Sequence, residues 1–317
     1  MKIIGNKITT NMSLFAFLGF LIIVFSFTSE HFLGYYNIIS LLTNISYSGI
    51  AAIVLTLVMI SRGLDISIGG VIGLTTVVVA TLYSQPDPFP VWLILIIGLS
   101  TGTLVGLLNG WCIAVMDMDP IITTLGAMAI TRGLAYVISD AQSILMFEET
   151  TDFISNGTIF YIPMPIILFL ITALIFSIIL HKSKFGRTIY AIGANEASAK
   201  LSGISVKPVK IILYVLSGLA ASVSGIILIG QTSVGMPQHG LGTELEVITA
   251  VLLGGTALSG GKGTIYGTIA GVLILGVLFN GLTISGVRYV HLQIFQGILL
   301  LVAVATYEIK TRNEVAS

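Results

Sequence analysis

Long apolar segments recur along most of this 317-residue chain and constrain its fold more than any other feature. A helix that crosses a membrane needs about 20 consecutive, mostly apolar residues. Ten segments fit, at residues 13–29, 45–61, 66–83, 91–115, 120–139, 162–181, 210–230, 244–259, 264–286 and 291–308. Only 9% of the residues are charged, against about 25% in a soluble domain. We therefore predict an all-α integral membrane protein with about ten transmembrane helices, forming a single membrane domain over residues 1–317.

Glycine spacing predicts that these helices pack closely. Two stripes recur every four residues, Gly98, Gly102, Gly106 and Gly110 in the fourth segment and Gly263, Gly267 and Gly271 in the ninth. Residues four apart share one helix face, and small residues there let helix backbones approach each other in lipid. We expect a Gly-rich, tightly packed bundle. The short eighth segment, between Gly-rich turns, is expected to be broken or re-entrant.

The distribution of basic residues predicts the orientation of the bundle. Loops on the cytoplasmic side carry an excess of Lys and Arg. The stretch 182–210 holds Lys182, Lys184, Arg187, Lys200, Lys207 and Lys210, and further basic residues flank the spans at Lys2, Lys7, Lys310 and Arg312. Residues 140–161 carry Asp140, Glu148, Glu149 and Asp152 without Lys or Arg. We expect both termini and residues 182–209 in the cytoplasm and residues 140–161 outside, which ten spans allow.

The chain lacks the usual residue patterns of enzymes and cofactor sites. Its single cysteine, Cys112, excludes a disulfide within the chain and a Cys-based metal site, and its four histidines show no ligand spacing. The Gly-rich run 254–264 departs from a phosphate-binding loop, because Thr256 replaces its first glycine and Gly263 follows Lys262. The net charge of zero gives no indication of nucleic acid binding. We expect no catalytic, metal or cofactor site here, and any ATP must bind to another chain.

Charged residues inside the predicted spans are few, and we expect no carboxylate near the middle of the bilayer. Ion-coupled carriers usually have carboxylates near the middle of the bilayer, so this scarcity argues against ion coupling and favours a neutral, hydroxyl-bearing solute. Polar side chains that are candidates for the solute route are Asp65, Ser67, Asn109, Thr123 and Asn280. Hydrogen bonding between helices is an equally good explanation for each of them.

The cytoplasmic stretch contains a short segment that predicts a docking element. Asn195 is a good helix N-cap, the following residues favour helix, and Gly203 is placed to end it. A short helix between two spans offers a soluble partner a rigid contact. A solvated connecting helix is the alternative.

Several blocks resemble one known family, the ribose/xylose/galactose-type ABC importer permeases. They are the runs 61–70, 109–110, 122–126, 132–134, 185–204 and 254–264, and the resemblance covers about residues 40–305. It implies a bacterial inner-membrane subunit that moves a pentose, a hexose or a related furanosyl compound. It also implies a second permease copy or close relative, ABC ATPase subunits and an extracytoplasmic solute-binding protein as partners.

The resemblance also assigns a role to the cytoplasmic stretch 182–209. It corresponds to the coupling loop of the family, with Asn195, Glu196, Ala197, Ala199 and Gly203 in the stretch that contacts the ATPase. At the opposite side, Arg288 in the turn 285–289 is a candidate contact for the binding protein. An ion-coupled secondary transporter and a channel-type membrane subunit remain the alternative functions.

Overall fold

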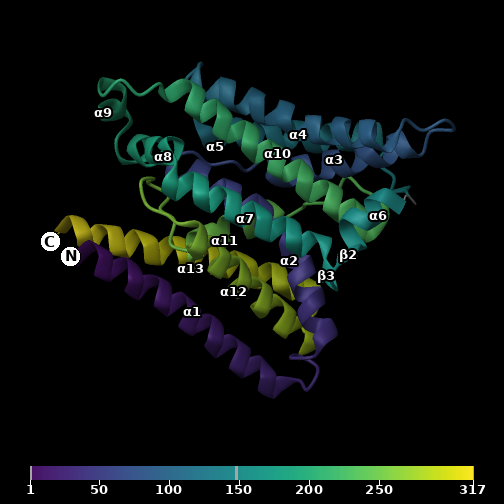
Figure 1. The fold of residues 1–317 in the computed structure, drawn as a ribbon, viewed down its shortest axis with the longest axis horizontal. Coiled ribbons are helices and arrows are strands. Elements are labelled where there is room, and N and C mark those ends of the chain that lie inside the picture. Colours follow the sequence, from purple (N-terminus) through teal and green to yellow (C-terminus); the bar gives the residue numbers. More distant parts are fainter. Residues whose placement is uncertain (1, 147–148, 317) are drawn as a thin grey trace.

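The computed structural model describes the backbone of residues 2–146 and 149–316 and the side chains of residues 13–146, 153–288 and 290–305. Helices dominate this part of the chain, and each of the ten predicted segments contains one (Figure 1). The helices are α1 (Lys2–Thr28), α2 (Tyr35–Ile60), α3 (Ile68–Tyr83), α4 (Val91–Ala114), α5 (Pro120–Ile138), α6 (Glu149–Asn156), α7 (Met164–Lys182), α8 (Lys184–Ala194), α9 (Glu196–Leu201), α10 (Val206–Thr232), α11 (Thr243–Leu253), α12 (Ile265–Ile284) and α13 (Tyr289–Ala316). The strands are β1 (Ile144–Leu145), β2 (Thr158–Ile159), β3 (Ile162–Pro163) and β4 (Val234–Gly235).

Six of the described helices are long and apolar enough to cross a membrane, namely α2, α4, α5, α7, α10 and α12. Shorter apolar helices cover residues 13–28 of α1, all of α3 and residues 290–305 of α13. The predicted eighth segment is broken. Its helix α11 has 11 residues, which at 1.5 Å each span about 16 Å, half of the hydrocarbon core. The chain enters α11 through β4, which pairs with β1, and through an irregular stretch.

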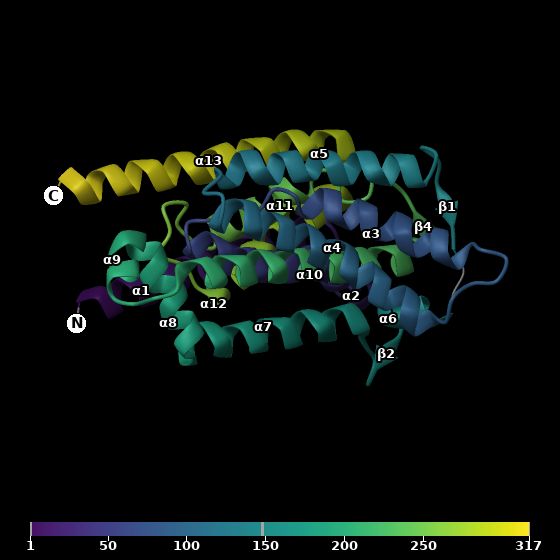
Figure 2. The same ribbon diagram turned by 90° about the horizontal axis from the view of Figure 1, so that it is seen from above.

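The two ends of the bundle carry different elements (Figures 1 and 2). The start of α1, the end of α13, α8 and α9 lie at one end, called here the α9 end. The opposite end, called the α6 end, carries α6, β1, β4 and the β2–β3 hairpin. This arrangement places the start of α1, the end of α13 and residues 182–209 together, opposite residues 140–146 and 149–161. Lys2, Lys7, Glu148, Glu149, Asp152, Lys310 and Arg312, which support the predicted orientation, lie outside the described side chains.

The core is built around α2 and α10. From Ile50 to Ile60, every α2 residue is buried, because α7, α10, α11 and α12 surround it. The glycine stripe of α4 packs along α10, as predicted: a Cβ at Gly106 would meet the backbone carbonyl oxygen of Tyr214. The second stripe is shorter than predicted, because Gly263 lies in the loop before α12.

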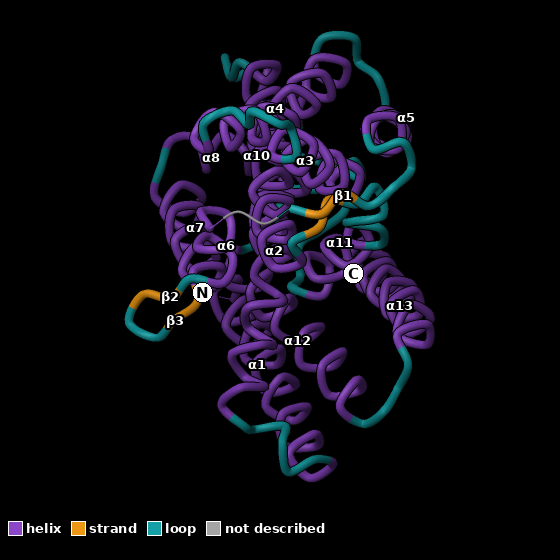
Figure 3. Tube along the Cα trace, turned by 90° about the vertical axis from the view of Figure 1, so that its right-hand side faces the viewer, coloured by secondary structure: helices purple, strands orange, loops and turns teal. Residues whose placement is uncertain are grey.

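Helices α5 and α13 lie on one side of the molecule and frame α11 (Figures 2 and 3). Helix α5 packs on α3 and α4, and α13 packs on α11 and α12. The irregular stretch before α11 lies on this side, and its Leu241 is 59% exposed. This side therefore combines exposed apolar helix faces with non-helical backbone.

Candidate functional site

The predicted short helix at 195–203 is present as α9, and its local geometry is the one that the sequence indicates. The Asn195 side chain accepts a hydrogen bond from the Ser198 backbone N–H at 3.0 Å, and Gly203 ends the helix with a φ of 81°. Ala199 is buried beneath the helix, whereas Asn195 and Ala197 are exposed. The exposed face of α9 can therefore contact another protein without unfolding.

Glu196 connects α9 to the start of α10. Its carboxylate oxygens lie 2.7 Å from Lys200 Nζ and 2.6 Å from Lys210 Nζ. Partial burial raises the pKa of Glu196, but the hydrogen bonds and positive charges of Lys200 and Lys210 outweigh it, so the net pKa is below its ordinary value. Glu196 is thus a carboxylate at neutral pH and holds α9 against α10.

A helix that sequence reasoning missed, α8, connects the short helix α9 to the core of the bundle. Its final carbonyl groups, at Gly193 and Ala194, accept hydrogen bonds from the Arg62 guanidinium, each at 2.8 Å. The Tyr190 hydroxyl donates to the Gly263 carbonyl at 2.7 Å. These hydrogen bonds join α8 to the residue that follows α2 and to the loop before α12. The sequence did contain a sign of this contact, because Arg62 interrupts an apolar run next to a glycine.

Three of the five predicted route residues form one buried cluster where the chain turns from α2 into α3. The Asp65 carboxylate accepts from the Ser67 backbone N–H at 3.0 Å and from the Ser67 hydroxyl at 2.6 Å, and the Asn109 amide donates to Ser67 Oγ at 3.0 Å. All three side chains are buried. Asp65 acts as a turn cap, and it forms no ion pair with Arg62, although both lie among the described side chains.

The other predicted residues lie apart from this cluster. The Thr123 hydroxyl donates to the Asp119 carbonyl one turn back in α5. Asn280 of α12 exchanges hydrogen bonds with Asn37 of α2, at 2.9 and 3.0 Å, and thereby joins two helices. Arg288 is exposed in the turn between α12 and α13. The structure brings together Asp65, Ser67 and Asn109, but not Thr123 or Asn280.

Carboxylates do lie within the bundle, contrary to the sequence-based expectation. Glu244 and Glu246 occupy the first turn of α11, and Glu244 is buried. Glu246 accepts a hydrogen bond at 2.9 Å from Ser48, which lies near the middle of α2. The predicted segment 244–259 begins at Glu244, so both carboxylates looked like residues of a segment end. They lie inside because the chain reaches α11 from within the bundle.

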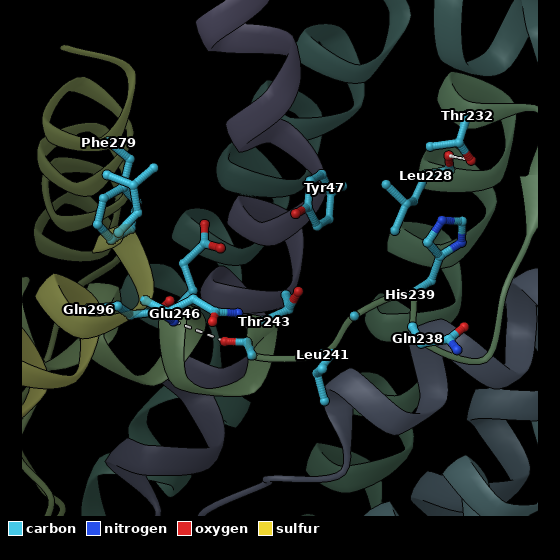
Figure 4. Close-up of a pocket in the computed structure, with 14 residues that line it drawn as sticks. Tyr47, Leu228, Thr232, Gln238, His239, Leu241, Thr243, Glu246, Phe279 and Gln296 are labelled. Carbon is cyan, nitrogen blue, oxygen red and sulfur yellow. Dashed lines mark hydrogen bonds between the residues drawn. The ribbon is translucent and has the colours of Figure 1, made fainter. Parts of the chain in front are cut away.

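A cavity of about 350 Å³ with a mixed polar and apolar lining opens beside the start of α11 (Figure 4). It is enclosed by α2, α10, α11, α12, α13 and the irregular stretch before α11. Polar side chains that line it are Tyr47, Thr232, Gln238, His239, Thr243, Glu246, Gln293 and Gln296. Figure 4 shows the oxygens of Glu246 and Tyr47 directed toward one open space, with His239 across from them. The cavity offers hydrogen-bond donors and acceptors to a small polar molecule.

Known proteins resemble this chain over most of its length. Residues 37–304 match the family described as "Branched-chain amino acid transport system / permease component". The ribose import permease protein of Bacillus subtilis (strain 168) is 39% identical over 91% of this chain and 90% of its own length. That of Escherichia coli (strain K12) is 37% identical over 90% and 89%. The L-arabinose transport system permease protein of the same strain is 37% identical over 82% and 79%. No solved structure matches the chain.

Proposed function

Because the chain belongs to this permease-component family, and is a multi-pass transport subunit rather than an enzyme, we propose that it carries a neutral sugar through an ABC importer. The observation that carries this proposal is near-full-length similarity to permeases named for ribose and L-arabinose. A pentose is the proposed solute, and a hexose or a related furanosyl compound is the wider class. The permease domain would extend over residues 1–317 in a bacterial inner membrane.

The family description also names branched-chain amino acids, which are the second candidate solutes. A free amino acid is a zwitterion, and its carboxylate needs a cation or several N–H donors in a low-dielectric site. Arg132, a basic side chain within α5, already donates to the backbone carbonyls of Pro237 and His239. The residues that line the cavity include a carboxylate but neither Lys nor Arg. Both observations favour a neutral solute.

The test is to purify the permease with its own ATPase and binding protein and to identify the small molecule that accompanies the complex. Mass spectrometry of the released solute should find a pentose or a related sugar. Leucine, isoleucine or valine in its place would support the second candidate.

ATPase subunits would dock at the α9 end, with residues 182–209 as the coupling loop. Asn195 and Ala197 would lie on the contact surface, whereas Ala199 and Gly203 would set the shape and tilt of α9. Glu196 would fix α9 to α10 through Lys210, while Lys200 is its partner within α9. This proposal is supported by the rigid cap and by the hydrogen bonds that connect α8 to α2.

A second permease copy, or a close relative, would cover the side framed by α5 and α13. Non-helical backbone at membrane depth is tolerated only where protein covers it or water reaches it, because lipid cannot satisfy its polar groups. The stretch before α11 is non-helical, and Leu241 within it is largely exposed. An apolar partner surface would cover Leu241 and leave a polar passage beside it.

The binding protein would dock at the α6 end, where Arg288 could pair with an acidic side chain. An exposed ion pair contributes only about 0–1 kcal/mol, so its effect would be on steering. Reversing the charge with Arg288→Glu should slow docking at low salt more than at high salt. Equal docking rates at low salt would remove Arg288 from the contact.

The solute route is proposed to pass at or next to Asp65, Ser67, Asn109, Thr123 and Asn280. Alanine at each position should change the transport rate or the range of sugars accepted. The cluster of Asp65, Ser67 and Asn109 is buried in the described conformation, so solute would reach it only after helices α2, α3 and α4 move apart. Unchanged transport in all five variants would leave these residues as packing contacts.

A further inference from the structure

We propose that the cavity beside α11 is a binding site for the sugar within the permease, and that Glu246 accepts hydrogen bonds from its hydroxyl groups. The proposal rests on the proposed function. It adds a site and a recognition residue that lie apart from the buried cluster at Asp65. The argument depends on the accessibility of the cavity, the free hydrogen-bonding capacity of its lining and its size.

Accessibility follows from how the lining side chains are arranged. Thr232 and Gln238, near the α6 end, and Gln293, in the first turns of α13, are exposed. His239 is buried and Tyr47 and Glu246 are partly buried, so they form the interior of the cavity. A small molecule arriving at the α6 end would meet the three exposed side chains first and the carboxylate afterwards. The proposed binding protein delivers solute at that same end.

Glu246 has hydrogen-bonding capacity to spare. A carboxyl group has two oxygens, each with lone pairs that can accept hydrogen bonds. Among the described residues, the Ser48 hydroxyl is its hydrogen-bond donor, and it uses one oxygen, Oε1. The Glu246 carboxyl group reaches the open space of the cavity in Figure 4. Two neighbouring sugar hydroxyls can donate to the two oxygens of one carboxylate, as the N–H groups of arginine do.

The remaining lining suits the other surfaces of a sugar. The amides of Gln238 and Gln293 both donate and accept hydrogen bonds, which matches hydroxyl groups that do the same. Phe279 supplies an apolar ring to a sugar's C–H face. A volume of about 350 Å³ falls in the range of about 300–1,000 Å³ that is usual for small-molecule sites. The mixture therefore favours a neutral polyhydroxylated molecule over an ion or a lipid tail.

The test is protection of an introduced cysteine in the assembled complex, in a Cys112→Ala background. Gln293→Cys places the thiol at the mouth of the cavity. Gln85→Cys is the matched control, because Gln85 is also exposed at the α6 end but does not line the cavity. Alkylation by a small hydrophilic thiol reagent is followed with and without D-ribose or L-arabinose, and glycine betaine controls for osmolarity. Transport of the same pentose is measured in parallel.

We expect the transported pentose to slow alkylation at position 293 and not at position 85. Glu246→Ala should raise the pentose concentration needed for half-protection about tenfold, the effect of one lost hydrogen bond. Glu246→Gln, which keeps one acceptor oxygen, should have a smaller effect. A 2-hydroxyl that donates to Glu246 is missing from the 2-deoxy form of the pentose. With that sugar, the half-protection concentrations of wild type and Glu246→Ala should then differ less than with the parent sugar.

Three results would overturn the proposal. One is an unprotected thiol in the Gln293→Cys variant of a complex that transports the pentose. Another is equal protection at positions 293 and 85, which would indicate a nonspecific effect. The third is unchanged half-protection in Glu246→Ala, provided that the variant assembles in normal amounts. Failure of every pentose to be transported would instead contradict the proposed function.

Discussion

Arg62 connects the core of the bundle to helix α8 through a guanidinium group with two backbone acceptors. It has a positive φ of 65° and donates from two nitrogens to consecutive carbonyls at the end of α8. A lysine carries a single ammonium group and cannot reproduce this two-pronged contact. Arg62 therefore has the geometry of a mechanical link between α8 and α2.

We predict that Arg62→Lys lowers the amount of solute moved per ATP hydrolysed severalfold. Loss of one charge-assisted hydrogen bond costs about 1.5–3 kcal/mol, which is enough to loosen the contact without unfolding the bundle. Arg187→Lys is the matched control, because Arg187 is exposed on α8, the helix that Arg62 contacts. Uptake and ATP hydrolysis are measured together in vesicles. An unchanged ratio in Arg62→Lys would show that α8 transmits movement by another contact.

Single residues were the hardest part to place from sequence. The N-cap at Asn195 and the left-handed glycine at Gly203 were predictable, because both depend on neighbours within a few residues. The partners of Arg62 lie 131 and 132 residues further along the chain, and Asn280 pairs with Asn37 243 residues away. Contacts at such separations follow from the packing of whole helices, which sequence periodicity does not specify.

Helix α4 packs on α10 because its glycines present no side chains. A Cβ at Gly106 would collide with the backbone of Tyr214, and one at Gly19 in α1 would meet nothing within 4 Å. The two positions allow the effect of crowding to be separated from that of helix propensity. Both glycines lie within helices, where alanine is the better helix former.

We predict that Gly106→Ala destabilises the folded permease by about 1–3 kcal/mol, the usual cost of overpacking. Gly19→Ala should be neutral or slightly stabilising. Thermal unfolding in detergent, followed by loss of the monodisperse protein, measures both. A stability loss at Gly19→Ala as large as that at Gly106→Ala would contradict the close contact between α4 and α10.

Helix α9 is the element on which energy coupling is predicted to depend. Gly203→Val forces a branched side chain into a left-handed conformation at about 1–2 kcal/mol, and Glu196→Lys replaces the partner of two lysines with a third positive charge. Both variants should insert and fold, and solute uptake should fall while ATP hydrolysis continues or the ATPase detaches. Ser198→Ala, on the exposed side of α9, is the control. Normal uptake per ATP in both variants would remove α9 from the coupling path.

Helix α11 shows which properties of a helix the sequence pattern predicts and which it does not. Its shortness and its glycine-rich flanks correctly predicted a broken segment. The depth of its two carboxylates was missed, because a chain that turns back inside the bundle has the same local sequence as one that turns at the surface. The pairing of β4 with β1 and the contact of Glu246 with Ser48 show that depth.

The bundle has the start of α1, the end of α13 and residues 182–209 at one end, which agrees with ten crossings. We predict that this end is cytoplasmic. In a Cys112→Ala background, an impermeant thiol reagent should label Gln85→Cys on intact cells and Ser198→Cys only after permeabilisation. Both positions are exposed on the protein, so the side of the membrane that the reagent can reach decides the result. The reverse labelling pattern would invert the proposed orientation.

The general class of this molecule was predictable from composition, segment count and motif order, because these are properties of the entire chain. Its solute was not, because recognition depends on a few side chains from distant helices. The cavity illustrates this, since its polar lining comes from residues as far apart as Tyr47 and Gln293.

The central claim is tested most directly by uptake into vesicles that contain the permease, its ATPase and its binding protein. The account predicts that D-ribose or L-arabinose accumulates when ATP is supplied and that L-leucine does not. Accumulation should stop when the ATPase is inactivated, whatever ion gradients are imposed. Accumulation of leucine alone, or pentose uptake driven by an ion gradient without ATP, would contradict the account.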